Sequence, residues 1–358
     1  MMMTDVAGRR AWIDAVRALC VIAIVLLHFQ IWVFDPTMRL YPNETRGLYD
    51  LSAFLGAFRM PALFVVSGLL VSRRVRLGWK ERRNAVRAVS SYYLYAVWVV
   101  MYAVLAAIWY RSPDRLQGML TQLVVPHATL WFILFLAINV VVMTTLHRVH
   151  PALVLGALVA LSVWMLSVTV ESPWDMLGRG AYYMLFFAIG VYFKPALDRF
   201  AAGGLWWKIP AFVVLLWVTI DALAHVPYRE AAWFALFLAR DIAAVVCAVA
   251  VAATITLLRP IAVLLSYIGR RTLVIYVLHV PLIWVVVSIR NRVAGETFDV
   301  AAALVFAPVV IVPAIIASSM VIGNLLKRSR VGRALFRMPR RVEERILNGG
   351  SSELRVLK

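Results

Sequence analysis

Residues able to do chemistry lie inside apolar segments of this chain. His28 follows Arg17 by eleven residues, and Asp14 precedes Arg17 by three. Eleven residues make about three helical turns, so Arg17 and His28 share one helix face and lie about 16 Å apart along its axis. Asp14 can pair with Arg17 near the inner end of this helix. One helix face thus carries a cation at one end and, towards the other end, an imidazole suited to general base catalysis.

A second apolar segment carries a charge at a similar depth. Arg59, followed by Met60 and Pro61, lies at about the same depth as His28. A charge inside a span costs about 2.5–3.5 kcal/mol on insertion scales, so it indicates a function or a specific partner. Pro61 removes a backbone donor and predicts a kink in this helix. An arginine and a histidine at one depth indicate a polar pocket between the helices.

Later apolar segments carry further polar candidates. Arg240 and Asp241 are adjacent in the outer half of one segment, and Tyr276 and His279 stand at helical spacing in another. Adjacent helical positions point in different directions, so we expect that Arg240 and Asp241 do not simply pair with each other. At least one of them should then face the interior of the bundle. Trp131 is a further candidate in a segment between these and the first two.

The elements that must position these residues are transmembrane helices. Of the 358 residues, 63% are hydrophobic and only 15% are charged, and the mean hydropathy is +0.84. Soluble domains have roughly half their residues apolar and about a quarter charged, so a surface of this composition requires lipid. A spanning helix needs about 20 mostly apolar residues, which allows about ten spans and no separate soluble domain. We predict an all-α, polytopic membrane helical bundle.

The predicted spans are apolar runs bounded by charges or by Pro and Gly clusters. They cover approximately residues 12–34, 51–71, 88–110, 129–147, 151–170, 180–193, 209–225, 233–257, 266–289 and 300–325. Residues 1–325 therefore form the predicted membrane domain, and residues 326–358 form a basic cytoplasmic tail. The tail interleaves Leu335, Phe336 and Met338 with basic residues, which predicts that it lies on the anionic inner leaflet.

Lysine and arginine positions predict the orientation of these spans. With the N-terminus inside, the inner segments carry 26 of the 37 basic residues and the outer loops carry eight, Arg290 among them. Basic residues collect on the cytoplasmic side of membrane proteins, so both termini are predicted to be cytoplasmic. The same rule explains the formal net charge of +19 without nucleic-acid binding. Cys20 and Cys247 each lie in an apolar run, which predicts buried free thiols and no thiolate metal site.

Four motifs on four different predicted spans resemble those of one protein family. They are the basic-x10-His pattern of residues 17–28 (RALCVIAIVLLH) and the segments 59–69 (RMPALFVVSGL), 130–133 (LWFI) and 268–279 (IGRRTLVIYVLH). In this order and on these spans they resemble acyltransferase family 3, the integral-membrane acyltransferases of envelope polysaccharides, glycolipids and some secondary metabolites. The resemblance covers about residues 10–325.

The resemblance implies ten core helices, an acyl-CoA donor on the cytoplasmic side and an acceptor on the outer side. The implied reaction transfers an acyl group, with acetyl as the favoured group, to a hydroxyl of a carbohydrate or glycolipid. Acetyl-CoA is then a donor substrate, no cofactor is tightly bound, and the implied location is the bacterial cytoplasmic membrane. Arg17 would hold the donor while its pantetheine arm reaches His28, because about 16 Å is roughly the length of that extended arm.

The resemblance and the chemistry together assign an expected role to each polar residue. The expected catalytic residues are His28 as general base, Arg59 for the oxyanion or the acceptor, and Asp241 to orient a catalytic group. The expected donor contacts are Arg17, Arg73, Arg74, Arg76 and Arg270, and the expected acceptor contacts are Trp131, Arg240, Tyr276 and His279. No metal site is expected. Each residue has a structural alternative, such as an ion pair, a topological charge or a hydrogen bond that serves packing.

The alternative function is a transporter or flippase for an envelope glycan or glycolipid precursor. Buried arginine, aspartate and histidine side chains also line transport paths. Transporters of this kind are often built from two repeats with interrupted helices, and the sequence shows no such repeat. A scaffold would leave the buried charges unexplained. The expected partners are the acyl-CoA donor, the acceptor and the lipid bilayer, and homo-oligomerisation stays open.

Overall fold

The computed structural model describes residues 11–38, 46–110, 118–124, 129–167, 175–203, 209–228, 230–293 and 300–348. These residues fold into helices joined by turns, and no strand occurs among them. The predicted all-α class is therefore confirmed. By their internal packing, the residues divide into two compact units, one of residues 1–66 and 195–325 (unit 1) and one of residues 67–194 and 326–358 (unit 2).

Unit 1 is built from helices near both ends of the sequence. It contains α1 (Ala11–Phe29), the π-helix η1 (Gln30–Phe34), α2 (Asp35–Met38), α10 (Ile209–His225), α11 (Ala231–Ile255), α12 (Arg259–Gly269), α13 (Thr272–Val293) and α14 (Val300–Leu326). The long helix α3 (Arg46–Val75) contributes its first part to unit 1 and its last part to unit 2. The short helix α9 (Lys194–Ala202) begins at the passage back into unit 1.

Unit 2 holds the middle of the sequence and its C-terminal segment. It contains η2 (Gly78–Lys80), α4 (Arg83–Tyr110), η3 (Thr121–Leu123), α6 (Trp131–Thr145), η4 (Leu146–Arg148), α7 (Pro151–Ser167), α8 (Asp175–Tyr192), α15 (Arg330–Ala334) and α16 (Arg340–Asn348). The chain passes from unit 1 to unit 2 after Leu325, and the predicted division into a membrane domain and a cytoplasmic tail stays a prediction.

Seven helices among the described residues are long and apolar enough to cross a membrane. They cover Ala11–Phe34, Phe54–Val75, Arg83–Trp109, Trp131–Arg148, Ala232–Ile255, Thr272–Arg292 and Pro308–Leu326. Met176–Tyr192 and Lys194–Ala202 meet at a bend of 73° and make an eighth if they form one span. The predicted spans 151–170 and 209–225 correspond to the shorter apolar helices Pro151–Met165 and Ile209–His225. The chain is a multi-pass helical membrane protein, while the count of ten and the orientation stay predictions.

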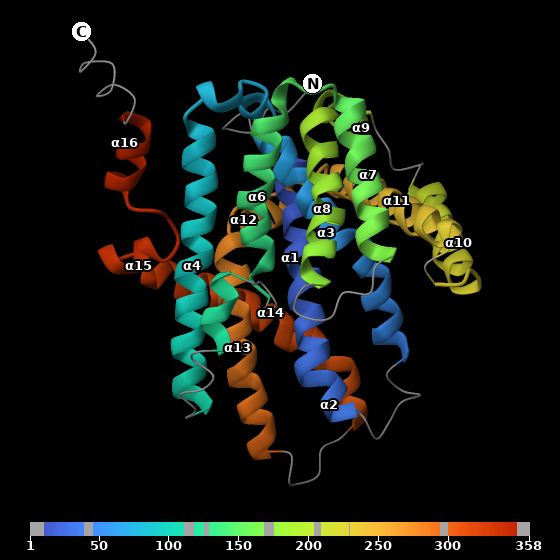
Figure 1. Cartoon of the computed structure of the whole chain (residues 1–358). Coiled ribbons are helices and arrows are strands. Elements are labelled where there is room, and N and C mark those ends of the chain that lie inside the picture. The colour runs from blue at the N-terminus through green and yellow to red at the C-terminus, as the bar shows by residue number, and fades with distance from the viewer. Residues whose placement is uncertain are drawn as a thin grey trace. The chain divides into compact units, whose positions relative to one another are not determined.

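The helix α1 is the central element of unit 1. It packs against α11, α12 and α13, and most of its side chains are buried. The helices α10 and α11 pair with each other (Figure 1, yellow), and Ala57 of α3 joins them in a buried cluster with Leu216 and Ala244. Both cysteines, Cys20 on α1 and Cys247 on α11, are buried and free, as predicted. A helix covered by its neighbours can carry polar side chains that do not face lipid.

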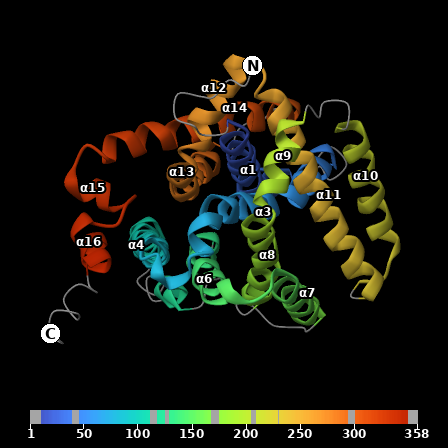
Figure 2. The same ribbon diagram turned by 90° about the horizontal axis from the view of Figure 1, so that it is seen from above.

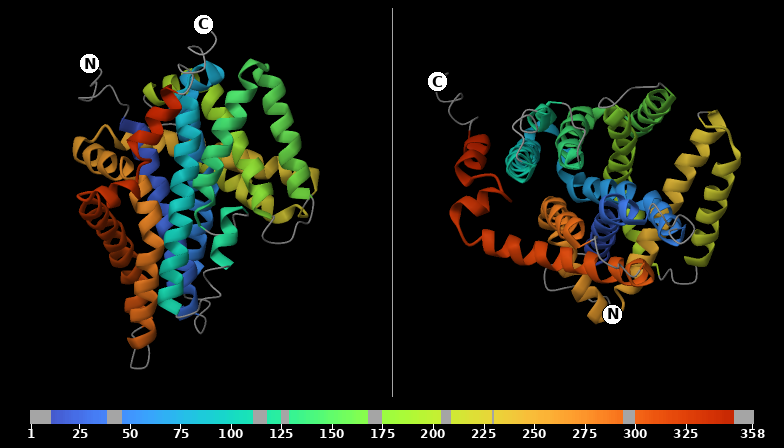
Figure 3. Two further views of the ribbon diagram at one scale, coloured as in Figure 1. Left: turned by 60° about the vertical axis from the view of Figure 1, so that its left-hand side comes forward. Right: turned by 90° about the horizontal axis from the view of Figure 1, so that it is seen from below.

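Unit 2 contains a row of helices in the order α4, α6, α8 and α7 (Figure 2). Each helix packs against the next one in the row. Large aromatic side chains fill this packing, and Trp98 and Tyr102 of α4 and Phe186 and Phe187 of α8 are fully buried. The helix α16 packs against α4 (Figure 3), so the end of the chain belongs to this unit.

The helices α3 and α8 approach each other closely at Gly68. A Cβ atom at this position would collide with the backbone carbonyl oxygen of Phe187. A backbone atom cannot rotate away as a flexible side chain can, so any larger residue must push the two helices apart. Small residues allow such close approach between membrane helices. Gly68 therefore fixes the distance between α3 and α8.

We expect the substitution Gly68→Ala to lower the stability of the protein by about 1–3 kcal/mol, the usual cost of overpacking a tight contact. The matched control is Gly156→Ala in α7, because no atom lies within 4 Å of the position that a Cβ atom of residue 156 would take. Alanine favours a helix over glycine by about 0.8–1.0 kcal/mol, so the control should be neutral or stabilising. The thermal unfolding midpoint in detergent measures both. Equal midpoints for the two variants would contradict the close approach.

Candidate active site

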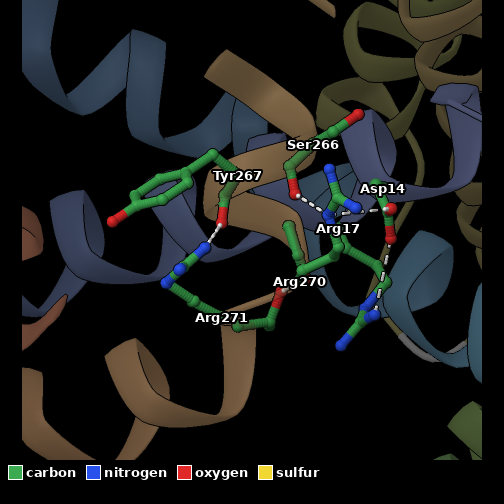
Figure 4. Close-up of polar contacts among 8 residues, drawn as sticks. Asp14, Arg17, Ser266, Tyr267, Arg270 and Arg271 are labelled. Atoms are coloured by element: carbon green, nitrogen blue, oxygen red, sulfur yellow. Dashed lines mark hydrogen bonds and ion pairs between the residues drawn. The ribbon is translucent and has the colours of Figure 1, made fainter. Parts of the chain in front are cut away.

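Polar side chains of unit 1 meet along α1 at three successive levels. At the first level Asp14, which is 2% exposed, lies between two guanidinium groups. Arg17 Nη1 is 3.7 Å from Asp14 Oδ1, and Arg270 Nε is 4.0 Å from Asp14 Oδ2, as Figure 4 shows. The predicted pair of Asp14 and Arg17 is confirmed, and Arg270 adds a second cation to the same carboxylate.

Arg270 reaches Asp14 because the backbones of α1 and α12 touch at Gly269. A Cβ atom at Gly269 would collide with the carbonyl oxygen of Asp14. The Nε of Arg270 also donates to the carbonyl oxygen of Ser266 at 3.1 Å, which holds the guanidinium beside α12. The sequence predicted one span from residue 266 to 289. The structure instead ends α12 at Gly269 and starts α13 at Thr272, whose hydroxyl donates to the Gly269 carbonyl at 2.7 Å.

At the second level two histidines face each other, and we call them the histidine pair. His28 of α1 and His279 of α13 have ring centroids 5.0 Å apart, and Nε2 of His279 lies 3.1 Å from Nδ1 of His28. His279 is fully buried and His28 is half-buried. The sequence placed both residues in spans but assigned His279 to the acceptor. The structure brings its ring into hydrogen-bond distance of His28.

The backbone determines which nitrogen atoms of the histidine pair carry protons. Nδ1 of His279 lies 3.2 Å from the carbonyl oxygen of Ile275, and a carbonyl can only accept. In neutral His279 the proton is therefore on Nδ1, which leaves Nε2 as an acceptor. His28 then donates from Nδ1, which also lies 3.0 Å from the carbonyl oxygen of Ile24. In this network the Nε2 atom of neutral His28 keeps its lone pair.

Two aromatic side chains pack against the histidine pair. The Trp32 ring centroid is 5.1 Å from that of His28, and the Tyr276 ring centroid is 5.9 Å from that of His279. Arg59 Nη1 of α3 donates to the carbonyl oxygen of Ser52 at 3.4 Å, and its position at the depth of His28 stays a prediction. The helix α3 runs without a break through Pro61, and the predicted kink there stays a prediction.

At the third level Arg290 of α13 binds the π-helix η1, which directly follows α1. Arg290 Nη1 donates to the carbonyl oxygen of Val33 at 3.1 Å and to that of Trp32 at 3.4 Å. A π-turn contains more residues than an α-turn, and such turns often occur beside functional residues. Arg290 follows His279 by eleven residues. The helices α1 and α13 are therefore held together at the histidine pair and again beyond it.

Arg240 and Asp241 pair with each other, so the prediction that adjacent positions prevent this is wrong. Arg240 Nε and Nη2 donate to Asp241 Oδ1 at 2.8 and 2.6 Å. The reason is the length of the arginine side chain, which bends round the helix although the two Cβ atoms diverge. Arg240 also lies over the ring of Phe237, 4.2 Å from its centroid. Asp241 is buried on α11, which packs against α1.

Trp131, Arg73, Arg74 and Arg76 lie in unit 2, whereas the other predicted site residues lie in unit 1. Trp131 stacks on Tyr183 of α8 with ring centroids 5.4 Å apart. Arg73 and Arg74 are exposed near the end of α3. Arg76 donates from Nη2 to two carbonyl oxygens at the C-terminal end of α8, each at 3.3 Å. Cations favour this end of a helix.

A comparison with protein families identifies the fold that carries these contacts. The model of acyltransferase family 3, described as an acyltransferase domain, matches residues 10–325. The chain belongs to acyltransferase family 3. The match includes all three levels of polar contact along α1 and the segment 59–69. No curated protein and no solved structure matches the chain significantly.

Membership of acyltransferase family 3 makes the chain a membrane acyltransferase. Two contacts of its candidate site were not predicted from the sequence. One is the direct contact of the two histidines. The other is Arg290, which was counted with an outer loop but lies within α13. A signal for Arg290 was available, because His279 and Arg290 have the same eleven-residue separation as Arg17 and His28. Equal separations on two helices indicate two polar faces of similar length.

We expect Asp14→Asn to destabilise the protein by about 1–3 kcal/mol, because two guanidinium groups lose their shared carboxylate. The side chains of Arg17 and Arg270 are 20% and 48% exposed, so water limits the loss below that of a fully buried pair. The control is Asp221→Asn in α10, whose side chain is 58% exposed beside His225 and which should change stability by under about 0.5 kcal/mol. Unfolding in detergent measures both, and equal losses would contradict the assigned role of Asp14.

Proposed function

We propose that this membrane acyltransferase transfers an acyl group from cytoplasmic acyl-CoA to a hydroxyl of a carbohydrate or glycolipid, with acetyl as the favoured group. The acceptor lies at the outer side of a bacterial cytoplasmic membrane. The observation that carries the proposal is the histidine pair, in line along α1 with the cations at Asp14. This arrangement offers a base at one depth and an anion-binding group at another, on a helix that crosses the membrane.

His28 acts as the general base of the proposed reaction. Its Nε2 atom accepts the proton of the acceptor hydroxyl while the hydroxyl oxygen attacks the thioester carbonyl carbon. The carbon–oxygen bond forms, and the resulting tetrahedral intermediate collapses when the carbon–sulfur bond breaks. The departing CoA thiolate takes the proton from the His28 imidazolium, so the products are an ester and the free thiol. No metal or redox step is needed to balance this transfer.

His279 is the positioning residue for His28. Its Nε2 atom accepts the hydrogen bond from His28 Nδ1, at the observed separation of 3.1 Å. This bond holds the tautomer in which the opposite nitrogen of His28 is the base, and it strengthens when His28 becomes an imidazolium. The sequence predicted that Asp241 orients a catalytic group, without naming that group. We now assign Asp241 to Arg240, which it binds through two hydrogen bonds.

The remaining predicted residues provide binding and charge stabilisation in this proposal. Arg59, which the sequence predicts at the depth of His28, stabilises the oxyanion of the tetrahedral intermediate. Arg17 and Arg270 bind phosphate groups of the donor, and their shared carboxylate keeps both guanidinium groups in place. Arg240 and Tyr276 contact the acceptor. Arg73, Arg74, Arg76 and Trp131 lie in unit 2, and their donor and acceptor roles stay predictions from the sequence.

The histidine substitutions test the proposed mechanism. We expect His28→Ala to lower kcat by about 10²–10⁴-fold, the usual contribution of a general base. His279→Leu should lower kcat by about 100-fold through misplacement of His28. His279→Gln should stay within about ten-fold of the wild type, because its amide oxygen can still accept from Nδ1. KM for the donor should be unchanged in all three. Thiol release from acetyl-CoA in proteoliposomes, with a panel of glycan and glycolipid acceptors, measures these values.

The same proteoliposomes distinguish the enzyme from the alternative transporter. If neither wild type nor His28→Ala releases thiol, and both move a labelled glycolipid precursor across the membrane at one rate, the chain is a transporter. If His279→Gln and His279→Leu lose equal activity, the positioning role of His279 is wrong even though His28 is the base. The unfolding midpoint of each variant shows whether the fold is intact.

We expect Arg17→Gln to raise KM for acetyl-CoA about ten-fold or more, with kcat little changed, because one charge-assisted bond to phosphate is lost. S-acetyl-pantetheine lacks the nucleotide phosphates, so the wild type and this variant should use it equally well. The control is Arg148→Gln, an exposed arginine of η4, which should leave both constants unchanged. A similar rise in KM with S-acetyl-pantetheine would exclude Arg17 as a phosphate ligand.

A further inference from the structure

The C-terminal residues 327–348, which we call the strap, are docked on α4 of the same unit (Figures 2 and 3). Trp98 Nε1 donates to the carbonyl oxygen of Leu335 at 2.7 Å, and the Tyr93 hydroxyl donates to that of Ala334 at 3.1 Å. The Phe336 ring packs against Trp98 with centroids 5.7 Å apart and is 8% exposed. The strap therefore has a specific binding position.

The contacts with α4 indicate how deep the strap lies. The span Arg83–Trp109 has 27 residues, which make about 40 Å of helix, roughly 10 Å more than the hydrocarbon core. Arg83 and Arg87 are at one end, so the excess length extends into the headgroups there. Tyr93 and Trp98 are about 15 and 22 Å along the helix from Arg83, so the strap residues that they bind lie about 5 to 12 Å inside the edge of the hydrocarbon core. Arg82 Nη1 donates to the carbonyl oxygen of Ile346 at 3.4 Å, so the strap extends from this depth along α4 to the headgroups.

Some arginines of the strap are engaged by the strap itself. Arg333 Nη1 donates to the carbonyl oxygens of Lys327 and Arg328 at 3.3 and 3.2 Å, and Arg337 pairs with Glu343 at 3.0 Å. A second group has exposed side chains that form neither an ion pair nor a hydrogen bond within the described ranges. This group comprises Arg328, Arg330, Arg340, Arg341 and Arg345. These guanidinium groups give the outer face of the strap an unbalanced positive charge.

Apolar side chains stand among the exposed arginines. Val331, beside Arg330, is 78% exposed, and Val342, beside Arg341, is 40% exposed. Arginines mixed with exposed apolar residues at the headgroup boundary are typical of segments that lie in a membrane surface. A soluble phosphate would use the arginines and leave the valines in water. A lipid uses both, because its headgroup meets the arginines and its acyl chain meets the valines.

We propose that the strap binds the headgroups of anionic phospholipids. The buried face, through Phe336 and the carbonyl groups bound by α4, fixes the strap along α4, and the outer arginines collect anionic lipid at the headgroups. This inference does not depend on the proposed acyl transfer. It goes beyond a general attraction of a basic tail to the leaflet, because it assigns a position on α4 and a particular set of side chains.

The test uses the full chain in nanodiscs of phosphatidylcholine with 30% phosphatidylglycerol as a chosen probe mixture, about the range in which anionic surfaces attract basic segments. An environment-sensitive fluorophore is attached at Val331→Cys, and either the anionic or the zwitterionic lipid carries a bromine quencher. The ratio of the quenching by brominated anionic lipid to the quenching by brominated zwitterionic lipid gives the local enrichment of anionic lipid. The triple variant Arg330, Arg340 and Arg341→Gln is compared with the triple variant Arg148, Arg259 and Arg292→Gln, whose residues are exposed outside the strap.

We expect clear enrichment of anionic lipid at the strap, a loss of about five-fold or more in the strap variant, and little change in the control. The proposal is overturned if the unsubstituted strap arginines give no enrichment, or if both triple variants lose it equally. It is also overturned if millimolar CoA or inorganic phosphate displaces the anionic lipid, since the surface would then be a site for soluble phosphate. If the strap variant does not fold, the labelled protein that keeps its strap arginines is measured instead, and high salt must abolish its enrichment of anionic lipid.

Discussion

A polar group inside a membrane must find its partner in the protein, because lipid offers no hydrogen bonds. Unit 1 depends on how α1 meets this constraint. The carboxylate of Asp14 meets two guanidinium groups, the ring of His28 meets that of His279, and the carbonyl groups of η1 meet Arg290. Each partner comes from α1 itself or from the neighbouring α12 and α13. The same contacts therefore bury the charges and fix the register of the helices around α1.

The histidine pair differs chemically from a histidine supported by a carboxylate. A buried carboxylate adds a charge whose desolvation must be compensated, whereas a neutral imidazole orients its partner by a hydrogen bond alone. The direction of that bond is fixed by the carbonyl oxygen of Ile275, which keeps the proton on Nδ1 of His279. The helical backbone of α13 thus selects the tautomer of a residue on α1. This device suits an apolar interior, because it needs no additional ion.

The fold class and one ion pair were predictable, because both depend on residues near each other in the sequence. Composition and apolar runs predicted the helices, and a three-residue spacing predicted the pair of Asp14 and Arg17. The histidine pair was not predictable from spacing, since its members are 251 positions apart. Arg290 was assigned to an outer loop because the predicted span ended at residue 289, where the apolar run stops. The Arg240 prediction failed because it followed the Cβ directions and ignored the length of the side chain.

The π-helix η1 gives the helix that carries His28 a point at which its length can change. The turn from Gln30 to Phe34 contains more residues than an α-turn, so deleting one residue there would restore α-helical winding. The residues beyond the deletion would keep nearly the same direction relative to His28, because the wide turn and an α-turn each complete about 360°. A single-codon deletion or insertion at this point is therefore absorbed within the turn, and the loop that follows α1 changes in length while the histidine pair stays in place.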